Sequence, residues 1–193
     1  GDYYVDYADD NAPDGKVVRL GDIIAYHNET TVDWFGAFLQ GKYDAEKFNL
    51  YGMGGISTIA YTYQDHFSVE KEVVEADAIT SFQVKGGGRY NLDDRLSAFA
   101  NIGYVQKPPI LDNVIDYDGN VSQNPDNEKF TSFEIGGEYG SELVAIKGSY
   151  YNTQWQDRNL TKSVSTGQGS SGDTDIIFLK GVNQNHKGIE IET

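Results

Sequence analysis

The chain has 193 residues, and its 15 Lys and Arg against 30 Asp and Glu give a formal net charge of -15. This excess of carboxylates argues against nucleic acid as a partner, because phosphate binding needs a basic surface. The absence of Cys excludes disulfides, thiolate metal sites and cysteine nucleophiles. No run of about 18 apolar residues is present, so the sequence predicts no transmembrane helix.

Alternation of apolar and polar residues with a period of two recurs along the chain, whereas helical periodicity is almost absent. The first 31 residues read as a long loop with a small hairpin around Val17 to Ala25. Strands are then predicted, in chain order, over 34–43, 48–63, 81–90, 96–104, 132–139 and 144–151, with a further strand beginning near Gly181. The sequence therefore predicts an all-β fold, an antiparallel meander of about seven to eight strands.

The predicted connections between strands are of two kinds. Short turns fall near 44–47, 92–94 and 140–142, whereas long polar connections fall near 1–31, 64–78, 107–128 and 158–175. Short turns at one end and long loops at the other are typical of an outer-membrane barrel, whose periplasmic turns are short and whose extracellular loops are long. We therefore expect a transmembrane β-barrel meander with extracellular long connections.

The two faces of the predicted strands differ in chemistry. One face is small at the strand centres and ends in tyrosines, with Tyr43, Tyr90 and Tyr139 near the short turns and Tyr61, Tyr104 and Tyr150 toward the long loops. The other face carries charge, at Lys85, Arg89, Glu134, Glu138 and Lys147. A lipid-facing band with aromatic girdles around a polar lumen has this pattern. A soluble antiparallel sandwich shows the same alternation, so it stays open as an alternative.

The long connections hold the candidate ligand-binding residues, because loops on a rigid scaffold commonly carry binding groups. Aromatic rings can stack on sugars or chelates, and the candidates are Tyr3, Tyr4, Tyr7, Asp112 and Tyr117. No Ser/His/Asp or paired-carboxylate arrangement stands out, so no catalytic residue and no enzymatic activity are expected. No cofactor is expected either.

Metal binding has one weak candidate in the sequence. Asp116, Asp118 and Asn120 have the D-x-D-x-N spacing that opens a calcium loop. The sixth position of that loop is not Gly and the twelfth is Asn127, so a solvated acidic loop is the favoured interpretation. His27, His66 and His186 lack a second ligand at metal-binding spacing and are expected to be structural or surface residues.

Four segments in chain order carry a family resemblance. They are residues 33–40 (DWFGAFLQ), 96–110 (LSAFANIGYVQKPPI), 150–158 (YYNTQWQDR) and 181–192 (GVNQNHKGIEIE). Together they resemble the barrel strands of TonB-dependent outer-membrane receptors, most of all those of Bacteroidota. The resemblance implies energy-coupled uptake of a scarce nutrient, such as a siderophore–metal chelate, a vitamin or a glycan, in the outer membrane of a Gram-negative cell.

The resemblance also implies partners. These are outer-membrane lipid, the remainder of the barrel, a plug domain that contacts TonB, a small-molecule or glycan ligand and, as a further option, a surface lipoprotein. No plug and no TonB-contacting box are visible in the sequence, and the chain does not end in an aromatic residue as the family's last strand usually does. A barrel of about 22 strands needs on the order of 600 residues. We therefore expect residues 1–193 to be part of the C-terminal half of a receptor barrel.

Two other readings of the whole chain stay open. A complete eight-stranded outer-membrane barrel with a structural or adhesive role fits the length. A soluble β-sandwich that binds glycans fits the alternation.

Overall fold

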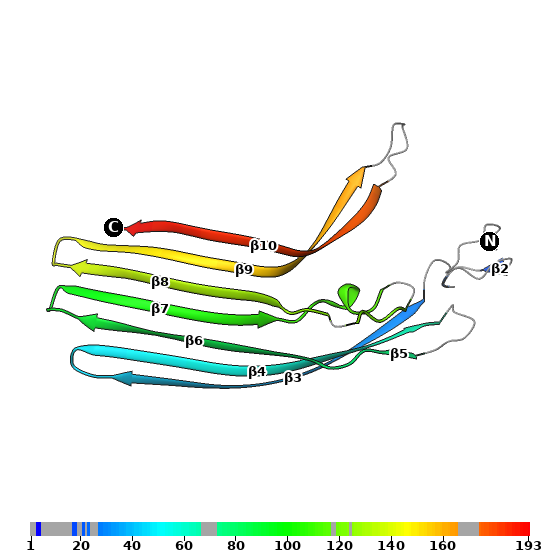
Figure 1. Cartoon of the computed structure of the whole chain (residues 1–193), viewed down its shortest axis with the longest axis horizontal. Coiled ribbons are helices and arrows are strands. Elements are labelled where there is room, and N and C mark those ends of the chain that lie inside the picture. The colour runs from blue at the N-terminus through cyan, green and yellow to red at the C-terminus, as the bar shows by residue number, and fades with distance from the viewer. Residues whose placement is uncertain are drawn as a thin grey trace. The chain divides into compact units, whose positions relative to one another are not determined.

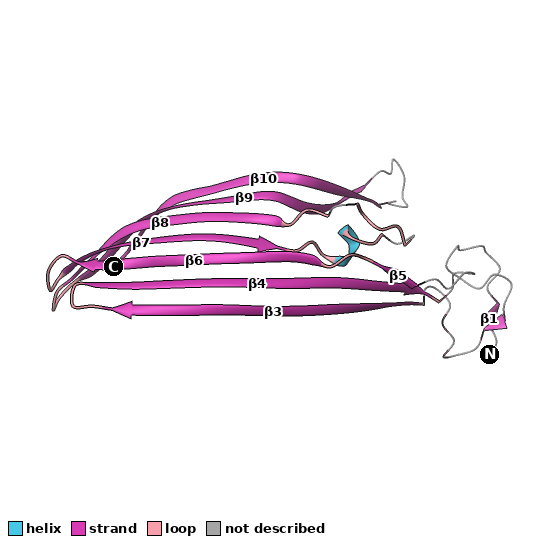
Figure 2. Cartoon of the chain, turned by 60° about the horizontal axis from the view of Figure 1, so that its bottom comes forward, coloured by secondary structure: helices cyan, strands magenta, loops and turns pink. Residues whose placement is uncertain are grey.

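A computed structural model describes residues 3–4, 17–18, 21, 23, 27–66, 73–116, 119–123, 125–165 and 174–193, with the backbone alone for 3–4, 17–18, 160–165 and 174–180. These residues are almost entirely strand, with one short helical turn (Figure 2). The elements are β1 (Tyr3–Tyr4), β2 (Val17–Val18), β3 (Asn28–Asp44), β4 (Phe48–Asp65), β5 (Val73–Glu75), β6 (Ile79–Asn91), β7 (Leu96–Lys107), the 3₁₀ turn η1 (Leu111–Asn113), β8 (Glu128–Gly140), β9 (Ala145–Ser165) and β10 (Thr174–Glu192). No helix among the described residues has the length and apolarity to cross a membrane.

The main sheet is an antiparallel meander, as the sequence predicts. Its order is β10-β9-β8-β7-β6-β4-β3, so strands that follow one another along the chain are neighbours in the sheet, and β5 pairs with β4 at the side. The registers of the β6–β7, β7–β8, β8–β9 and β9–β10 pairs are all antiparallel. The all-β fold prediction is therefore confirmed.

The chain divides into two compact units, and the larger one comprises Phe35–Thr58, Thr80–Pro109 and Asp126–Thr193. Its short turns, at 45–47, 92–95 and 141–144, lie together at one end of the strands, where the C-terminus also lies (Figure 1). In the second turn, the Asp93 carboxylate accepts hydrogen bonds from the backbone N–H groups of Arg95 and Leu96, both at 2.8 Å. These two bonds hold the pKa of Asp93 below its usual range.

The smaller unit comprises Gly1–Trp34, Ile59–Ile79 and Ile110–Pro125. Its described core is a cluster of Tyr61, Tyr63, Val114 and Ile115, each less than 9% exposed. Partly buried side chains of β4, β5 and η1 pack against this cluster, among them Ile59, Val74 and Leu111. Apolar burial of this kind is the main stabilising contribution available to a small unit.

Tyr61 corrects one expectation from the sequence. The alternation placed it in an aromatic row on the apolar face, but it is 6% exposed and packs in the core of the smaller unit. Gly52, Gly54 and Gly55 interrupt the alternation of β4, and without their side chains the phase of the strand cannot be read. The Tyr61 ring therefore packs against its neighbours in the cluster and is not part of an exposed aromatic row.

Strand ends differ from the sequence prediction at several places. β3 begins at Asn28, and β5 lies within the connection expected at 64–78. β9 runs on to Ser165 and β10 begins at Thr174, so the connection expected at 158–175 is shorter. Polar residues such as Asn159 and Thr161 read as loop, but the ladder joins backbone groups and does not need apolar side chains. β2, at the start of the small hairpin expected around Val17 to Ala25, pairs with β1, and most of the rest of that hairpin lies outside the described residues.

Candidate functional site: the polar face of the main sheet

Alternate residues of β4 and of β6 to β10 place polar side chains on one face of the larger unit, called the polar face below. Across β6, β7, β8, β9 and β10, the register aligns Gly87, Asn101, Glu134, Tyr151 and Gly188 in one row. Neighbouring residues on each strand point to the opposite, apolar face. The charged positions that the sequence assigned to one face therefore do share it.

A chain of hydrogen bonds crosses the middle of the polar face. The Tyr51 hydroxyl donates to Asn101 Oδ1 at 3.0 Å, and Asn101 Nδ2 donates to Glu134 Oε2 at 3.0 Å. Tyr51 lies on β4 and Asn101 on β7, so this link passes over β6 at Gly87. A Cβ atom at Gly87 would lie 2.6 Å from the Tyr51 ring and would also overlap Asn101 Oδ1. The missing side chain is therefore what lets the network cross the strand.

Two more glycines on this face lie beneath aromatic rings of adjacent strands. A Cβ at Gly136 on β8 would lie 2.5 Å from the Phe99 ring of β7, and one at Gly188 on β10 would lie 2.9 Å from the Tyr151 hydroxyl of β9. An aromatic ring that covers a cross-strand glycine protects its backbone and fixes the register. This arrangement explains part of the excess of Gly and Tyr in the sequence.

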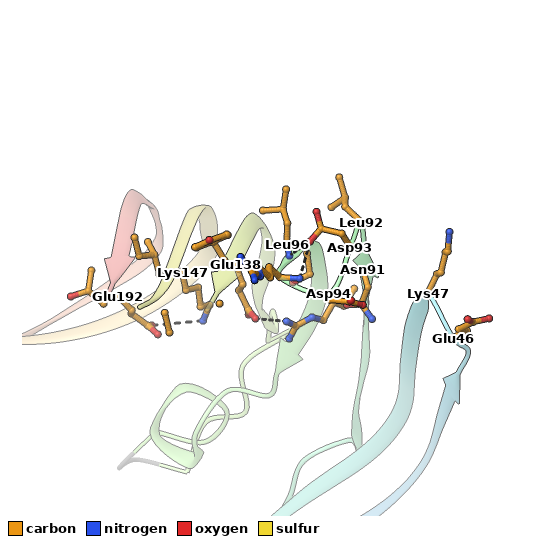
Figure 3. A pocket seen from close by; sticks show the side chains of 18 residues that line it. Glu46, Lys47, Asn91, Leu92, Asp93, Asp94, Leu96, Glu138, Lys147 and Glu192 are labelled. Atoms are coloured by element: carbon orange, nitrogen blue, oxygen red, sulfur yellow. Dashed lines mark hydrogen bonds and ion pairs between the residues drawn. The ribbon is translucent and has the colours of Figure 1, made fainter. Parts of the chain in front are cut away.

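The end of the polar face near the short turns is charged (Figure 3). Arg89 and Glu138 form an ion pair at 2.6 Å, and Lys147 and Glu192 form a longer one at 3.7 Å. All four side chains are at least 30% exposed, and they line a hollow of about 760 Å³. The hydroxyl of Ser97, which also lines this hollow, is buried and has no hydrogen-bond partner among the described residues.

The opposite end of the polar face is organised by Glu128, the first residue of β8. Its side chain is 5% exposed and accepts hydrogen bonds from Lys107 Nζ at 3.4 Å, Trp155 Nε1 at 3.0 Å and the backbone N–H of Asn159 at 3.3 Å. A buried carboxylate needs such donors, because desolvation penalises an unpaired charge. Glu128 thereby links the ends of β7 and β8 to β9.

Aromatic and guanidinium groups extend this cluster. The Phe130 and Trp155 rings lie 4.6 Å apart, and the Arg158 guanidinium lies 3.9 Å from the Trp155 ring centroid. Arg158 also donates to Gln184 Oε1 on β10 at 2.8 Å. Nearby, Asp157 has a positive φ of 56° at an irregularity in the β9–β10 pairing. Trp155 and Arg158 lie in segment 150–158, whose sequence indicates a family resemblance but does not predict these contacts.

The ligand-binding candidates from the sequence fall largely outside this face. Tyr3 and Tyr4 form β1, but their side chains lie outside the described residues, as do Tyr7 and Tyr117 altogether. Asp112 lies in η1, in the smaller unit. Their role as ligand contacts stays a prediction.

Two of the candidate calcium residues, Asp116 and Asn120, are hydrogen-bonded to each other. Asp116 accepts a hydrogen bond from the backbone N–H of Asn120 at 2.8 Å and another from Asn120 Nδ2 at 3.1 Å, so both carboxylate oxygens are engaged within the loop. Asp118 lies outside the described residues. Across the part of the chain that the structure describes, no group of three or more His, Cys, Asp or Glu side chains is assembled for a metal. Calcium binding gains no support from this geometry.

Two of the three histidines contact each other, which the sequence did not predict. His27 and His66 lie at the far ends of the β3–β4 hairpin, with their ring centroids 4.5 Å apart. Their separation along the chain conceals this contact, which only the hairpin register reveals. His186 lies elsewhere, opposite Thr153 in the β9–β10 pair.

Comparisons with known proteins found one matching family and solved structures with a similar fold. The family described as "TonB dependent receptor-like, beta-barrel" matches residues 1–193. A solved structure described as "Copper transporter OprC" has a TM-score of 0.60 at 17% identity, covering 84% of this chain and 26% of that one. The alcaligin outer-membrane receptor FauA from Bordetella pertussis has a TM-score of 0.54 at 17% identity, covering 85% of this chain and 27% of that one. No curated protein matches the sequence.

These comparisons agree with the geometry of the sheet. The chain spans about a quarter of the length of the two solved receptors. At 17% identity, their likeness shows the fold, whereas the family match covers every residue of the chain. The chain therefore belongs to the TonB-dependent receptor β-barrel family, a family of outer-membrane transporters and not of enzymes.

Proposed function

We propose that this chain forms part of the wall of a receptor that imports a scarce nutrient through the outer membrane by energy-coupled transport. The nutrient classes that fit are a siderophore–metal chelate, a vitamin or a glycan. The observation that carries the proposal is the division of one sheet into a hydrogen-bonded polar face and an apolar face. In a receptor barrel the polar face lines the lumen and the apolar face meets lipid.

The exposure of the apolar face supports this assignment. Leu39, Ile102 and Ile135 are 81%, 66% and 58% exposed, values that are unfavourable in water over a continuous patch and favourable in lipid. Aromatic pairs flank this band on the same face. They are Tyr43–Phe48 near the short turns and Phe82–Tyr104 and Phe133–Tyr150 farther along the strands. Aromatic girdles at the two headgroup boundaries have this arrangement.

The open edges of the sheet favour a wall segment over the two other readings. β3 and β10 are the ends of the strand order, and no pairing joins them in the part of the chain that is described. A complete eight-stranded barrel would pair its first and last strands, since open edges are not tolerated in lipid. A sandwich would need a second sheet packed on the main one. The edges instead fit pairing with the remainder of a larger barrel.

The remaining partners follow from this assignment. A plug domain would fill the lumen and contact TonB, outer-membrane lipid would surround the apolar face, and a surface lipoprotein would cap the extracellular side if one is present. The connections expected from the sequence near 1–31, 64–78 and 107–128, and the shorter one between Ser165 and Thr174, would then be extracellular. Tyr3, Tyr4, Tyr7, Asp112 and Tyr117 are the residues of these connections that we propose to contact ligand.

Transport can be tested in the cells that make the full receptor. We expect deletion of the receptor to abolish uptake of one nutrient from a panel of labelled siderophore chelates, vitamins and oligosaccharides. Complementation should restore uptake, and a protonophore should abolish it again, because TonB coupling draws on the proton gradient. Uptake of every panel member that is insensitive to both deletion and protonophore would contradict the proposal. Recovery of the receptor in the soluble fraction after detergent-free lysis would contradict it independently.

A further inference from the structure

The negative charge of the chain is concentrated in the smaller unit. That unit, Gly1–Trp34, Ile59–Ile79 and Ile110–Pro125, contains 16 Asp and Glu against 3 Lys and Arg, a formal charge of -13. The larger unit contains 14 Asp and Glu against 12 Lys and Arg, a formal charge of -2. The excess of carboxylates over the whole chain therefore belongs almost entirely to one of the two units.

Most of the described carboxylates of the smaller unit reach solvent. Its described residues include seven Asp and Glu and no Lys or Arg, and their histidines carry a charge only when protonated. Asp65 is partly buried, and the other six are exposed: Glu29, Asp33, Glu75, Asp77, Asp112 and Asp116. These six come from three separate segments of the chain, so the surface charge is a property of the unit and not of one loop.

The cations at the ends of β7, β8 and β9 away from the short turns are already engaged within the larger unit. Lys107 lies 3.4 Å from the Glu128 carboxylate, and Lys129 lies 2.7 Å from the Asp157 carboxylate. The Arg158 guanidinium lies 3.9 Å from the centroid of an indole ring and donates a hydrogen bond to a side-chain amide of β10. An anionic ligand would have to displace an internal partner from each of these three described cations.

We infer, on the basis of the proposed function, that the nutrient imported by this receptor carries a net positive charge. In that function the connections that form much of the smaller unit are extracellular, so a ligand meets their carboxylates before it enters the lumen. A surface of one sign of charge raises the local concentration and the association rate of an oppositely charged ligand by about 10- to 1,000-fold. A positively charged metal chelate or an amine-bearing vitamin fits this surface. An anionic chelate would be repelled, and an uncharged glycan would gain nothing from it.

The residues proposed to contact ligand have the chemistry that a cation requires. Tyr3, Tyr4, Tyr7 and Tyr117 carry aromatic rings and Asp112 carries a carboxylate, and all five belong to the smaller unit. The face of an aromatic ring attracts a cation through the quadrupole of the ring. None of the five is Lys or Arg, the side chains that bind carboxylate and phosphate groups. This set therefore favours a cation over an anion of the same size.

The first test uses the full receptor in its native cells and starts from the compound whose uptake depends on the receptor. We expect that compound to be a cation bearing an amine or a charged chelate. For an amine, acetylation removes the charge and succinylation reverses it, and we expect the KM of uptake to rise by about tenfold with the first change and further with the second. A receptor-dependent nutrient that is anionic or uncharged would overturn the inferred charge. Absence of any receptor-dependent uptake would instead contradict the proposed function.

Ionic strength separates the effect of charge from that of shape. Raising it from about 0.01 M to about 0.15 M shortens the Debye length from about 30 Å to about 8 Å. The KM of the cationic compound should therefore rise with salt, whereas that of its acetylated derivative should stay constant. The same salt dependence for both compounds would show that the modification acts through shape and would overturn electrostatic selection.

A second test measures the charge of the surface without any nutrient. In the full receptor in detergent, with its other cysteines replaced, Thr31→Cys places an exposed thiol in the smaller unit, and Leu143→Cys places one in a short turn of the larger unit. Each thiol is treated with a trimethylammonium-bearing and with a sulfonate-bearing methanethiosulfonate. The ratio of the two rates cancels differences in thiolate fraction. We expect this ratio to favour the cationic reagent at Thr31→Cys by about tenfold more than at Leu143→Cys.

Neutral variants show which carboxylates produce that preference. The triple variant Glu75→Gln, Asp77→Asn and Asp112→Asn should lower the ratio at Thr31→Cys, whereas Glu142→Gln, which removes an exposed carboxylate from a short turn of the larger unit, should leave it unchanged. Heat-modifiable migration on gels checks that each variant is folded. Equal ratios at the two thiols, or a ratio that the triple variant does not change, would overturn the inferred charge selection whatever nutrient is transported.

Discussion

The two faces of the main sheet are built from neighbouring residues of the same strands, yet different interactions stabilise them. On β7, Asn101 bonds to Tyr51 on one side and Glu134 on the other, while the next residue, Ile102, is 66% exposed. Side chains of the polar face hydrogen-bond to one another across strands, with glycines leaving room for the side chains that cross. The exposed side chains of the apolar face are stabilised only by an apolar environment. The contrast teaches that one face is specified by contacts within the protein, whereas the other is the face that the proposed function assigns to lipid.

The largest effect is expected on the polar face, at Glu128. Replacing it by Ala leaves the part-buried Trp155 indole N–H and the part-buried Asn159 backbone N–H without their acceptor. An unsatisfied buried donor costs about 1–3 kcal/mol, and the lower half of this range applies to each of these two donors, so we expect a loss of about 3 kcal/mol in the free energy of unfolding. Urea unfolding of the full receptor in lipid vesicles measures this loss.

The matched control for that change is Glu138→Ala at the other end of the same strand. Glu138 is 30% exposed and forms an ion pair with Arg89, which is 47% exposed. Exposed pairs contribute less than about 1 kcal/mol, so Glu138→Ala should change the free energy of unfolding only slightly. Equal losses for the two glutamates would refute the view that burial distinguishes the two ends of the polar face.

The next largest effect is expected on the apolar face. Ile102→Arg places a charge where the assignment puts lipid, and a charge at the bilayer midplane of a barrel costs about 2–4 kcal/mol. The measurement is the same unfolding experiment in vesicles. Thr153→Lys, on the polar face of β9, is the control and should cost much less because the lumen is wet. The reverse order of the two losses would show that the faces have been exchanged.

A smaller effect tests the glycines beneath the cross-strand contacts. Gly87→Ala forces a Cβ to within 2.6 Å of the Tyr51 ring, so the Tyr51–Asn101 bond must shift or break. Overpacking of this kind costs about 1–3 kcal/mol. Gly52→Ala is the control, because a Cβ there meets nothing within 4 Å. If both variants unfold at the same urea concentration, Gly87 has no steric role.

The smallest effect concerns Asp93 in the turn between β6 and β7. Its pKa is lowered by the hydrogen bonds from Arg95 and Leu96, so the ionised carboxylate is the form that stabilises the turn. A lowered pKa gives a contribution that is complete above the usual value of about 4 and is lost as the pH falls through the folded-state value. Asp93→Ala should therefore be less stable than the unmodified receptor at pH 7, with the difference vanishing near pH 2.

The pH series for that turn is an unfolding curve for each protein at intervals between pH 7 and pH 2. Asp94→Ala, one residue along the same turn, serves as the control. A difference between Asp93→Ala and the unmodified receptor that stays constant over the whole series would contradict the carboxylate role.

The strand prediction succeeded where side chains alternate and failed where they do not. Residues 81–90 and 96–104 alternate cleanly, and β6 and β7 lie over them. The extension of β9 to Ser165 was missed because its outer residues are polar and pair through their backbones. Tyr61 was placed on the wrong face because glycines hide the phase of β4. In each case the error arose where the backbone, and not the side-chain pattern, determines the structure.

The sequence by itself determined the class of the protein: alternation set the strands and their two faces, and its motifs indicated the receptor family. Tertiary structure alone decided which residues meet. Tyr51 reaches Asn101 over Gly87, Glu128 collects three donors, and His27 stacks on His66, each through partners far apart in the chain. The physical reason is that contacts across strands depend on register. The alternation repeats every two residues, so registers that differ by two residues present the same faces, and the pattern alone does not distinguish them.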